Sequence, residues 1–232
     1  MSFNRQGNSL QRSAPVVFNL IIINALAYFA QVMISGFDVT EWGALHYYKS
    51  SAFQPHQFLT NMFLHGSFGH ILFNMFGLWM FGSTLERYLG SKKFLLFYLI
   101  CGIGAGIFIQ LTVPFSAEQY AASVSKVTDG IPTAQLIQMY KEQYGAIGAS
   151  GAIMGVMAAF AYLFPNTPMF VMFIPVAVKA KYVIPVFILL DLFSGLNPTP
   201  GDNIGHFAHL GGAIVGFVVI YIWNKTNKKS FY

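Results

Sequence analysis

Long runs of apolar residues limit what this chain can fold into more than any other feature. Five such runs, each of about 20 residues, cover the stretches 15–34, 66–85, 94–112, 145–164 and 204–223. A helix needs about 20 mostly apolar residues to cross the hydrocarbon core of a bilayer. Only 9% of the residues are charged, whereas a soluble domain carries roughly 25%. The sequence therefore predicts an all-α membrane protein.

A sixth apolar run is interrupted by charge. It lies between the fourth and the last of the other runs, and Lys179 and Lys181 divide it. We place the fifth helix in chain order at 182–196. We interpret 169–178, which contains Pro175, as a connector that lies against the membrane. The predicted fold is a bundle of six transmembrane helices.

The distribution of basic residues tests this topology independently. With six spans and a cytoplasmic N-terminus, all but three of the 13 lysines and arginines lie on the cytoplasmic side, as the positive-inside rule requires. The three exceptions are Lys49, Lys126 and Lys141. Residues 1–14 are then a cytoplasmic tail, 15–224 the membrane domain and 225–232 a basic cytoplasmic tail. The scattered positive charge indicates contact with anionic lipid head groups, and nucleic-acid binding is not expected.

Four polar residues within the predicted spans lie at a similar depth. His70 and Asn74 belong to the second span, Ser150 to the fourth and His209 to the sixth, and these spans run in the same direction. From the rise of 1.5 Å per residue, the histidines and the serine lie roughly 6 to 8 Å below the outer ends of their helices. His70 and Asn74 are four residues apart, so both project from one helix face. Such residues inside a span indicate a functional site.

The residue types at this depth suit acyl transfer. A serine hydroxyl attacks a carbonyl when a neighbouring base removes its proton, and a neutral imidazole does so near pH 7. Ser150 is therefore the candidate nucleophile and His209 the candidate general base. The oxyanion of the tetrahedral intermediate needs fixed donors, which the Asn74 amide, the His70 imidazole and the Ser150 backbone N–H can supply. Glycines on either side of the serine let a peptide backbone approach it.

Small residues predict how two of these helices pack. They recur along one face of the fourth span and of the sixth span, and such stripes let membrane helices approach closely. The two stripes are Gly148, Ala152, Gly155 and Ala159, and Ala208, Gly212 and Gly216. We expect the two spans to be in contact, with Ser150 and His209 beside the contact.

Other features narrow the chemistry and the compartment. The single cysteine, Cys101, excludes an internal disulfide, and neither a metal nor a cofactor is expected. The polar stretch 114–144 is predicted to be an external connection, with a short surface helix at 135–143. The N-terminal segment lacks the features of a cleaved signal or of an organelle transit peptide. This favours a retained first helix in a bacterial-type plasma (inner) membrane.

Several other polar residues have more than one interpretation. Asp191, in the fifth span, either orients a catalytic imidazole or is a hydrogen-bonded structural acid, and we favour the structural role. His206 and His65 are also interpreted as structural, His65 because it can hold its loop against the second span. Glu86 and Arg87, at the cytoplasmic end of that span, are predicted to form a local ion pair and to anchor the interface.

The polar motifs together resemble the signature of the rhomboid family of intramembrane serine proteases. The segments that carry the resemblance are His65-Gly-Ser-Phe-Gly-His70-Ile-Leu-Phe-Asn74, Gly148-Ala-Ser150-Gly151 and Ala208-His209-Leu-Gly-Gly. The resemblance implies that Ser150 is the nucleophile, His209 the general base, and His70 and Asn74 oxyanion donors, in a dyad with no obligatory acid. It also implies transmembrane substrates cut near the outer face, and a flexible cap over the site at 195–203.

Two positions depart from the family pattern. Met154 stands where many members have an aromatic residue that packs on the base, and we assign Gly148 and Met154 to the substrate pocket. His56-Gln57 stands at about the place of a Trp-Arg pair that is common in the first external loop. We predict an intramembrane serine endopeptidase. The alternative is a catalytically inert rhomboid-like protein that binds transmembrane clients, whereas a transporter or a histidine metal site would leave Ser150 without a role.

Overall fold

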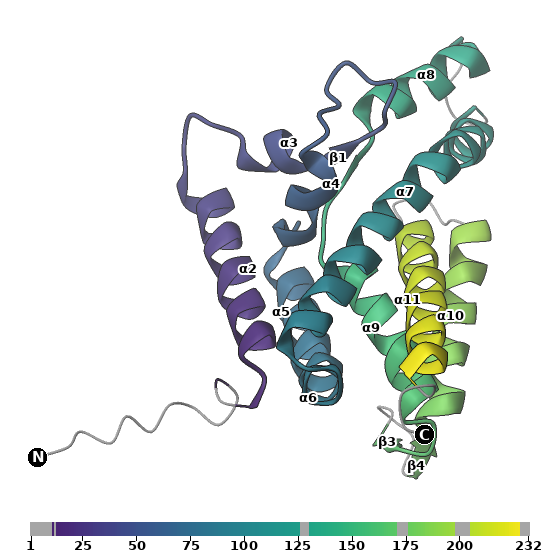
Figure 1. The fold of residues 1–232 in the computed structure, drawn as a ribbon. Coiled ribbons are helices and arrows are strands. Elements are labelled where there is room, and N and C mark those ends of the chain that lie inside the picture. The colour runs from purple at the N-terminus through teal and green to yellow at the C-terminus, as the bar shows by residue number, and fades with distance from the viewer. Residues whose placement is uncertain (1–10, 12, 126–129, 171–175, 198–204, 228–232) are drawn as a thin grey trace, which may run out of the picture.

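The protein consists mainly of helices that stand side by side, as the computed structural model shows (Figure 1). The structure describes residue 11 and residues 13–125, 130–170, 176–197 and 205–227. The long helices are α2 (Pro15–Met33), α7 (Ser91–Val124), α9 (Ser150–Leu163), α10 (Ala180–Leu196) and α11 (His206–Asn227). In Figure 1, α2 stands at one side, and α10 and α11 stand at the other.

The second apolar run folds as one helix whose winding changes halfway. α5 (Phe68–Gly77) passes into the π-helical turn η2 (Leu78–Gly82) and continues as α6 (Ser83–Leu89). Single π-turns within helices often lie near functional sites. Here the turn directly follows the helix that carries His70 and Asn74.

Short elements connect the long helices at the top of Figure 1. They are α3 (Val39–Gly43), β1 (Leu45–His46), α4 (Gln57–Thr60), the 3₁₀ turn η1 (Asn61–Phe63), α8 (Thr133–Gln143) and β2 (Gly145–Ala146). β1 and β2 pair antiparallel, with Leu45 opposite Ala146. This pairing joins the loop after α2 to the segment that leads into Ser150.

Each of the six predicted runs contains a helix. Among the described residues, α2, α7 and α11 are the three helices that are long and apolar enough to cross a membrane, whereas α9 is apolar but has only 14 residues. The fold is thus that of a helical membrane protein. Crossing by all six helices remains a prediction.

The predicted end of the third helix at 112 was wrong, because α7 continues through Pro114 to Val124. Proline removes one N–H from the helical ladder, but membrane helices tolerate it where neighbouring groups compensate. Ala117 and Ala121, beyond the proline, are fully buried, and α8 packs alongside. Tertiary packing therefore extends the helix past the position where the sequence favours a break.

The predicted connector at 169–178 contains a pair of short strands. β3 (Pro168–Phe170) and β4 (Ala177–Lys179) are antiparallel, with Met169 opposite Val178. Pro175 lies outside the described residues. The same is true of 198–203, which is the greater part of the predicted cap.

α9 and α11 touch through their glycines, as the small-residue stripes predict. A Cβ atom at Gly212 would collide with the carbonyl oxygen of Gly151, and one at Gly216 would collide with the backbone of Gly155. The two backbones are therefore in direct contact. This contact brings the start of α9 next to the start of α11.

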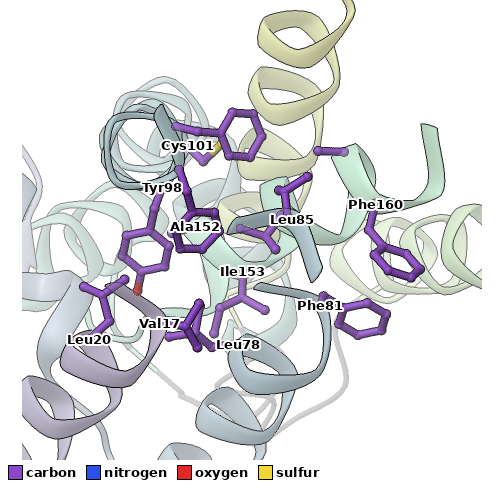
Figure 2. Packing of buried hydrophobic residues seen from close by; sticks show 14 of the residues in the cluster. Val17, Leu20, Leu78, Phe81, Leu85, Tyr98, Cys101, Ala152, Ile153 and Phe160 are labelled. Carbon is purple, nitrogen blue, oxygen red and sulfur yellow. The ribbon is translucent and has the colours of Figure 1, made fainter. Parts of the chain in front are cut away.

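A cluster of large buried side chains joins the helices around α9 (Figure 2). The cluster includes Val17 and Leu20 from α2, Leu78 and Phe81 from η2, Leu85 from α6, Tyr98 and Cys101 from α7, and Ile153 and Phe160 from α9. All of these side chains are buried. The helices that carry the candidate site residues are therefore fixed against a packed core.

Glu86 does not pair with Arg87, so that predicted ion pair was wrong. Its buried carboxylate accepts hydrogen bonds from the backbone N–H groups of Val16 at 3.0 Å and Val17 at 2.8 Å, and from the Ser91 hydroxyl at 2.6 Å. Arg87 instead donates to the Thr84 hydroxyl. The first N–H groups of a helix have no intrahelical acceptor. Glu86 thus caps α2 and ties it to α6.

Candidate active site

Ser150 is the first residue of α9 and follows a turn that requires glycine. Gly148 has a φ of 132°, in a region that residues with a side chain rarely adopt. A Cβ atom at Gly148 would lie 2.9 Å from His70 Nε2 and 3.6 Å from Ser150 Oγ. The Gly148 N–H donates to the Asn61 carbonyl at 2.8 Å, which holds the turn in place. The missing side chain leaves space beside both Ser150 and His70.

His70 presents a hydrogen-bond donor to this space. The Gly66 N–H donates to His70 Nδ1 at 3.3 Å, so in the neutral ring the proton is on Nε2. Nε2 is the ring atom closest to the space beside Gly148. The Ser67 hydroxyl oxygen accepts from the His70 N–H at 3.1 Å and caps α5. The local sequence therefore fixes both the position and the tautomer of His70.

Asn74, one turn further along α5, has an amide donor without an acceptor. The residue is buried, and within the described parts of the chain its Nδ2 has no hydrogen-bond partner. A buried amide that lacks a partner is costly. A group that carries negative charge on oxygen, such as a tetrahedral intermediate, can satisfy it.

Asp191 holds two histidines at once. One carboxylate oxygen lies 2.7 Å from His206 Nδ1, and the other lies 3.0 Å from His209 Nδ1. Because a carboxylate only accepts hydrogen bonds, both rings carry a proton on Nδ1. The Nε2 of a neutral His209 is then unprotonated, which is the form that a general base requires. The sequence allowed this orienting role but favoured a purely structural one.

A single cavity of about 1400 Å³ brings the predicted groups together. Its lining includes Ser150 and Gly148 from the start of α9, His70 and Asn74 from α5, and His209 from α11. These residues are far apart in the sequence. The fold therefore brings together the residues that the sequence grouped as a candidate nucleophile, a candidate base and candidate oxyanion donors.

The Ser150 hydroxyl and the His209 ring are not hydrogen-bonded to each other in the part of the chain that the structure describes. The backbones beside them are nevertheless in contact, because a Cβ atom at Gly151 would lie 3.4 Å from the Ala208 carbonyl oxygen. Hydrogen bonds between catalytic groups are often long in unliganded enzymes and shorten when substrate binds. Contact between Ser150 and His209 therefore remains a proposal.

Met154 lies one turn below Ser150 and is buried between helices. It packs with Ala158 of the same helix and with Ala213 of α11. Met154 is not among the described residues that line the cavity. Any effect of this residue on the predicted substrate pocket is therefore indirect, through the packing of α9 on α11.

His56 and Gln57 anchor the loop that was predicted to be the first external one. The Gln57 side chain is buried, accepts from the Gln54 N–H at 3.0 Å and donates to the Ala52 carbonyl at 3.0 Å. The His56 ring stacks on Trp42, with 4.5 Å between the ring centroids. The sequence showed only that the Trp-Arg pair is absent from this loop, whereas the structure shows the contacts that His56 and Gln57 make there.

His65 ties its loop to α2 through its backbone, whereas the sequence predicted that it holds the loop against the second span. Its backbone N–H donates to the Gln31 Oε1 at 2.9 Å, which ties the loop to α2. The buried ring packs edge-on to His70, with 5.0 Å between centroids. Burial lowers the pKa of His65 to about 4. His65 is therefore neutral at physiological pH.

The fold and the cavity together define a helical membrane protein with a polar site that contains serine and histidine. A family model described as the rhomboid domain matches residues 52–226, which is most of the chain. The chain belongs to the rhomboid family. This family includes serine proteases that act within membranes, so membership agrees with the class of chemistry that the site residues suggest.

The chain is also similar to individual members of this family. It is 30% identical over 224 residues to the rhomboid protease AarA of Providencia stuartii, with 88% of this chain and 70% of that protein covered. It is 29% identical over 225 residues to the RHOMBOID-like protein 12, mitochondrial, of Arabidopsis thaliana, with 93% of this chain and 60% of that protein covered.

A third relative comes from an animal. It is the presenilin-associated rhomboid-like protein, mitochondrial, of Mus musculus, which is 29% identical over 223 residues, with 92% of this chain and 50% of that protein covered. The chain thus spans between half and about two thirds of the length of these relatives. Two of the three names contain the word mitochondrial, so these relatives do not support the predicted plasma membrane location.

Proposed function

We propose that this chain is an intramembrane serine endopeptidase that cleaves transmembrane segments of membrane proteins near their outer ends. The observation that carries this proposal is the shared cavity, to which α5, α9 and α11 contribute His70, Asn74, Ser150 and His209. Membership of the rhomboid family supports it. No resident cofactor has a step in this mechanism.

The proposed reaction begins when the Ser150 hydroxyl attacks the carbonyl carbon of the scissile peptide bond. His209 Nε2 takes the hydroxyl proton, and the Oγ–C bond forms. The resulting oxyanion accepts hydrogen bonds from His70 Nε2, the Asn74 amide and the N–H of Ser150. Collapse of the intermediate breaks the C–N bond, and His209 donates its proton to the leaving amine. Water then hydrolyses the acyl-enzyme by the same route.

The topology that we propose has six membrane-crossing helices in residues 15–224 and both termini in the cytoplasm. The excess of lysine and arginine on the cytoplasmic side supports this orientation. It places the cavity near the outer surface, where water can reach it. In this topology the protein is embedded in the lipid bilayer, and its substrates are transmembrane proteins. We assign the chain to a membrane that it crosses several times, without assigning the organelle.

The decisive experiment uses a fluorophosphonate probe and a panel of transmembrane substrates in reconstituted vesicles. The wild type should be labelled and should cleave at least one substrate, and Ser150→Ala should abolish both. Ser194→Ala is the matched control, since this hydroxyl on α10 donates to the Leu190 carbonyl of its own helix and Ser194 is not among the described residues that line the cavity. Labelling that survives Ser150→Ala would overturn the proposal.

The second candidate is an inert protein that binds transmembrane clients. The missing hydrogen bond between Ser150 and His209 in the described structure is the observation that favours it. The same experiment separates the two candidates, because an inert protein would bind the substrates but would show neither labelling nor cleavage.

A further inference from the structure

The cavity that contains Ser150 is much larger than the space around the predicted catalytic groups. Its volume of about 1400 Å³ exceeds the roughly 300–1,000 Å³ that is common for small-molecule sites. It continues from Ser150 to the C-terminal part of α7 and to α8. Because α7 has 34 residues, it is about 51 Å long, whereas the hydrocarbon core of a bilayer is about 30 Å thick. In the proposed topology, the end of α7 therefore stands outside the hydrocarbon core.

The part of the cavity between these two helices, which we call the outer arm, has two different walls. One wall is a face of α7 that carries hydroxyl and amide groups at helical spacing. The other is a face of α8 with mainly apolar and aromatic side chains. The residues of the outer arm are Thr112, Ser116, Gln119 and Ser123 on α7, and Leu136, Met139, Tyr140 and Gln143 on α8. No Asp, Glu, Lys or Arg is found among the described residues that line the cavity.

The walls of the outer arm are held in place by the rest of the fold. The rings of Tyr120 and Tyr140 join α7 to α8, with 5.1 Å between centroids. The Ser50 hydroxyl donates to the Glu142 carbonyl at 3.3 Å, which ties the end of α8 to the first external loop. Gln119 Nε2 donates to the Leu196 carbonyl at the end of α10, at 3.0 Å. These contacts tie the arm to several elements of the fold.

We propose that the outer arm binds the uncharged polar segment of a substrate that continues outward from the cleaved transmembrane helix. This inference rests on the proposed function. A segment that enters beside Ser150 can continue along the cavity without leaving it. Its backbone N–H groups need acceptors where water is displaced. The Thr112 and Ser123 hydroxyls already donate to carbonyls of α7, and Gln119 Nε2 donates to the Leu196 carbonyl, so the hydroxyl and amide oxygens of α7 are left to accept from the substrate backbone. A charged segment would lose hydration and meet no opposite charge in the described lining.

The test compares two substrates that share one transmembrane helix and one cleavage site. The first keeps an external flanking segment of about 15 uncharged residues, which reach about 50 Å when extended, and the second lacks it. The variant Met139→Asp places a charge in the outer arm. Its matched control is Gln135→Asp, because Gln135 is exposed on the same helix and does not line the cavity. Fluorophosphonate labelling of Ser150 measures the catalytic groups separately.

For the wild type, we expect the flanked substrate to have a roughly tenfold lower KM than the trimmed one, with a similar kcat, because uniform binding changes KM alone. Met139→Asp should raise KM about tenfold for the flanked substrate only, and Gln135→Asp should change neither substrate. Labelling should be equal in all three proteins. If the wild-type enzyme had equal KM values for the two substrates, or if Met139→Asp changed both KM values equally, the proposed role of the outer arm would be overturned. Absent labelling of the wild type would instead refute the proposed function.

Discussion

The two ends of the contact between α9 and α11 differ in how they are packed. Along most of their length the two backbones touch through glycines, and a cluster of large apolar side chains covers α9 (Figure 2). At the end that holds Ser150 and His209, the same helices border an open cavity. The difference shows that the tight contact positions the open site. Substitutions in the glycine contact should reduce stability, and substitutions of the polar side chains that face the cavity should reduce rate.

The largest effect should come from the glycine contact itself. Gly212→Ala places a Cβ atom against the Gly151 carbonyl oxygen, and because both groups are backbone, the helices have to separate. We expect little folded protein, measured as the yield of monodisperse protein in detergent. Gly69→Ala is the control, since a Cβ atom at Gly69 meets nothing within 4 Å. Normal yield and activity of Gly212→Ala would show that the contact is not needed.

The cap on α2 should contribute less than the glycine contact. Glu86→Gln leaves one carbonyl oxygen for two backbone N–H groups and removes the negative charge that the start of α2 favours. Hydrogen bonds to charged groups contribute about 1.5–3 kcal/mol each, so we expect a loss of about 3 kcal/mol in the free energy of unfolding. Arg87→Gln is the control, since the Arg87 side chain donates to the Thr84 hydroxyl of its own helix. Equal stability of the two variants would contradict the capping role.

The neutral state of His65 predicts that stability falls as the pH is lowered. Its pKa is about 4 in the folded protein against a usual value of 6.5, so below pH 6.5 the unfolded chain binds a proton that the folded protein does not. Between pH 6.5 and 5 this should cost about 2 kcal/mol, and the loss should level off below pH 4. His65→Gln should have a flatter stability curve over this range. Parallel curves for the two proteins would show that His65 does not titrate as proposed.

The sequence predicted where the helices lie and which four polar residues would line one cavity, for reasons that particular residues show. Apolar runs located the helices, and shared depth grouped Ser150, His209, His70 and Asn74 in advance. The extension of α7 past Pro114 was missed, because it depends on burial of Ala117 and Ala121 against other elements. The cap formed by Glu86 was also missed, since its partners are backbone groups 69 and 70 residues away. Local patterns do not encode such long-range contacts.

Asp191 offers the most specific test of how the catalytic base is oriented at the open end. Its two carboxylate oxygens each accept from the Nδ1 of a different histidine, and an asparagine has only one acceptor oxygen for these two donors. In Asp191→Asn, therefore, one imidazole faces an NH₂ group and has to place its proton on Nε2. If that ring is His209, Nε2 no longer accepts the proton of Ser150.

We expect Asp191→Asn to lower kcat by about tenfold, with KM unchanged. This is the lower end of the range found when a residue that orients a metal-bound histidine is replaced. The rate of fluorophosphonate labelling should fall by the same factor, because both reactions need the base. Binding of a transmembrane substrate to the Ser150→Ala protein should not change when Asp191→Asn is added. His206→Gln frees one carboxylate oxygen without disturbing the bond to His209, so it should retain most of the activity. A larger loss of kcat in His206→Gln than in Asp191→Asn would instead assign the role of base to His206. The Nε2 of His206 would then be the atom that takes the proton of Ser150.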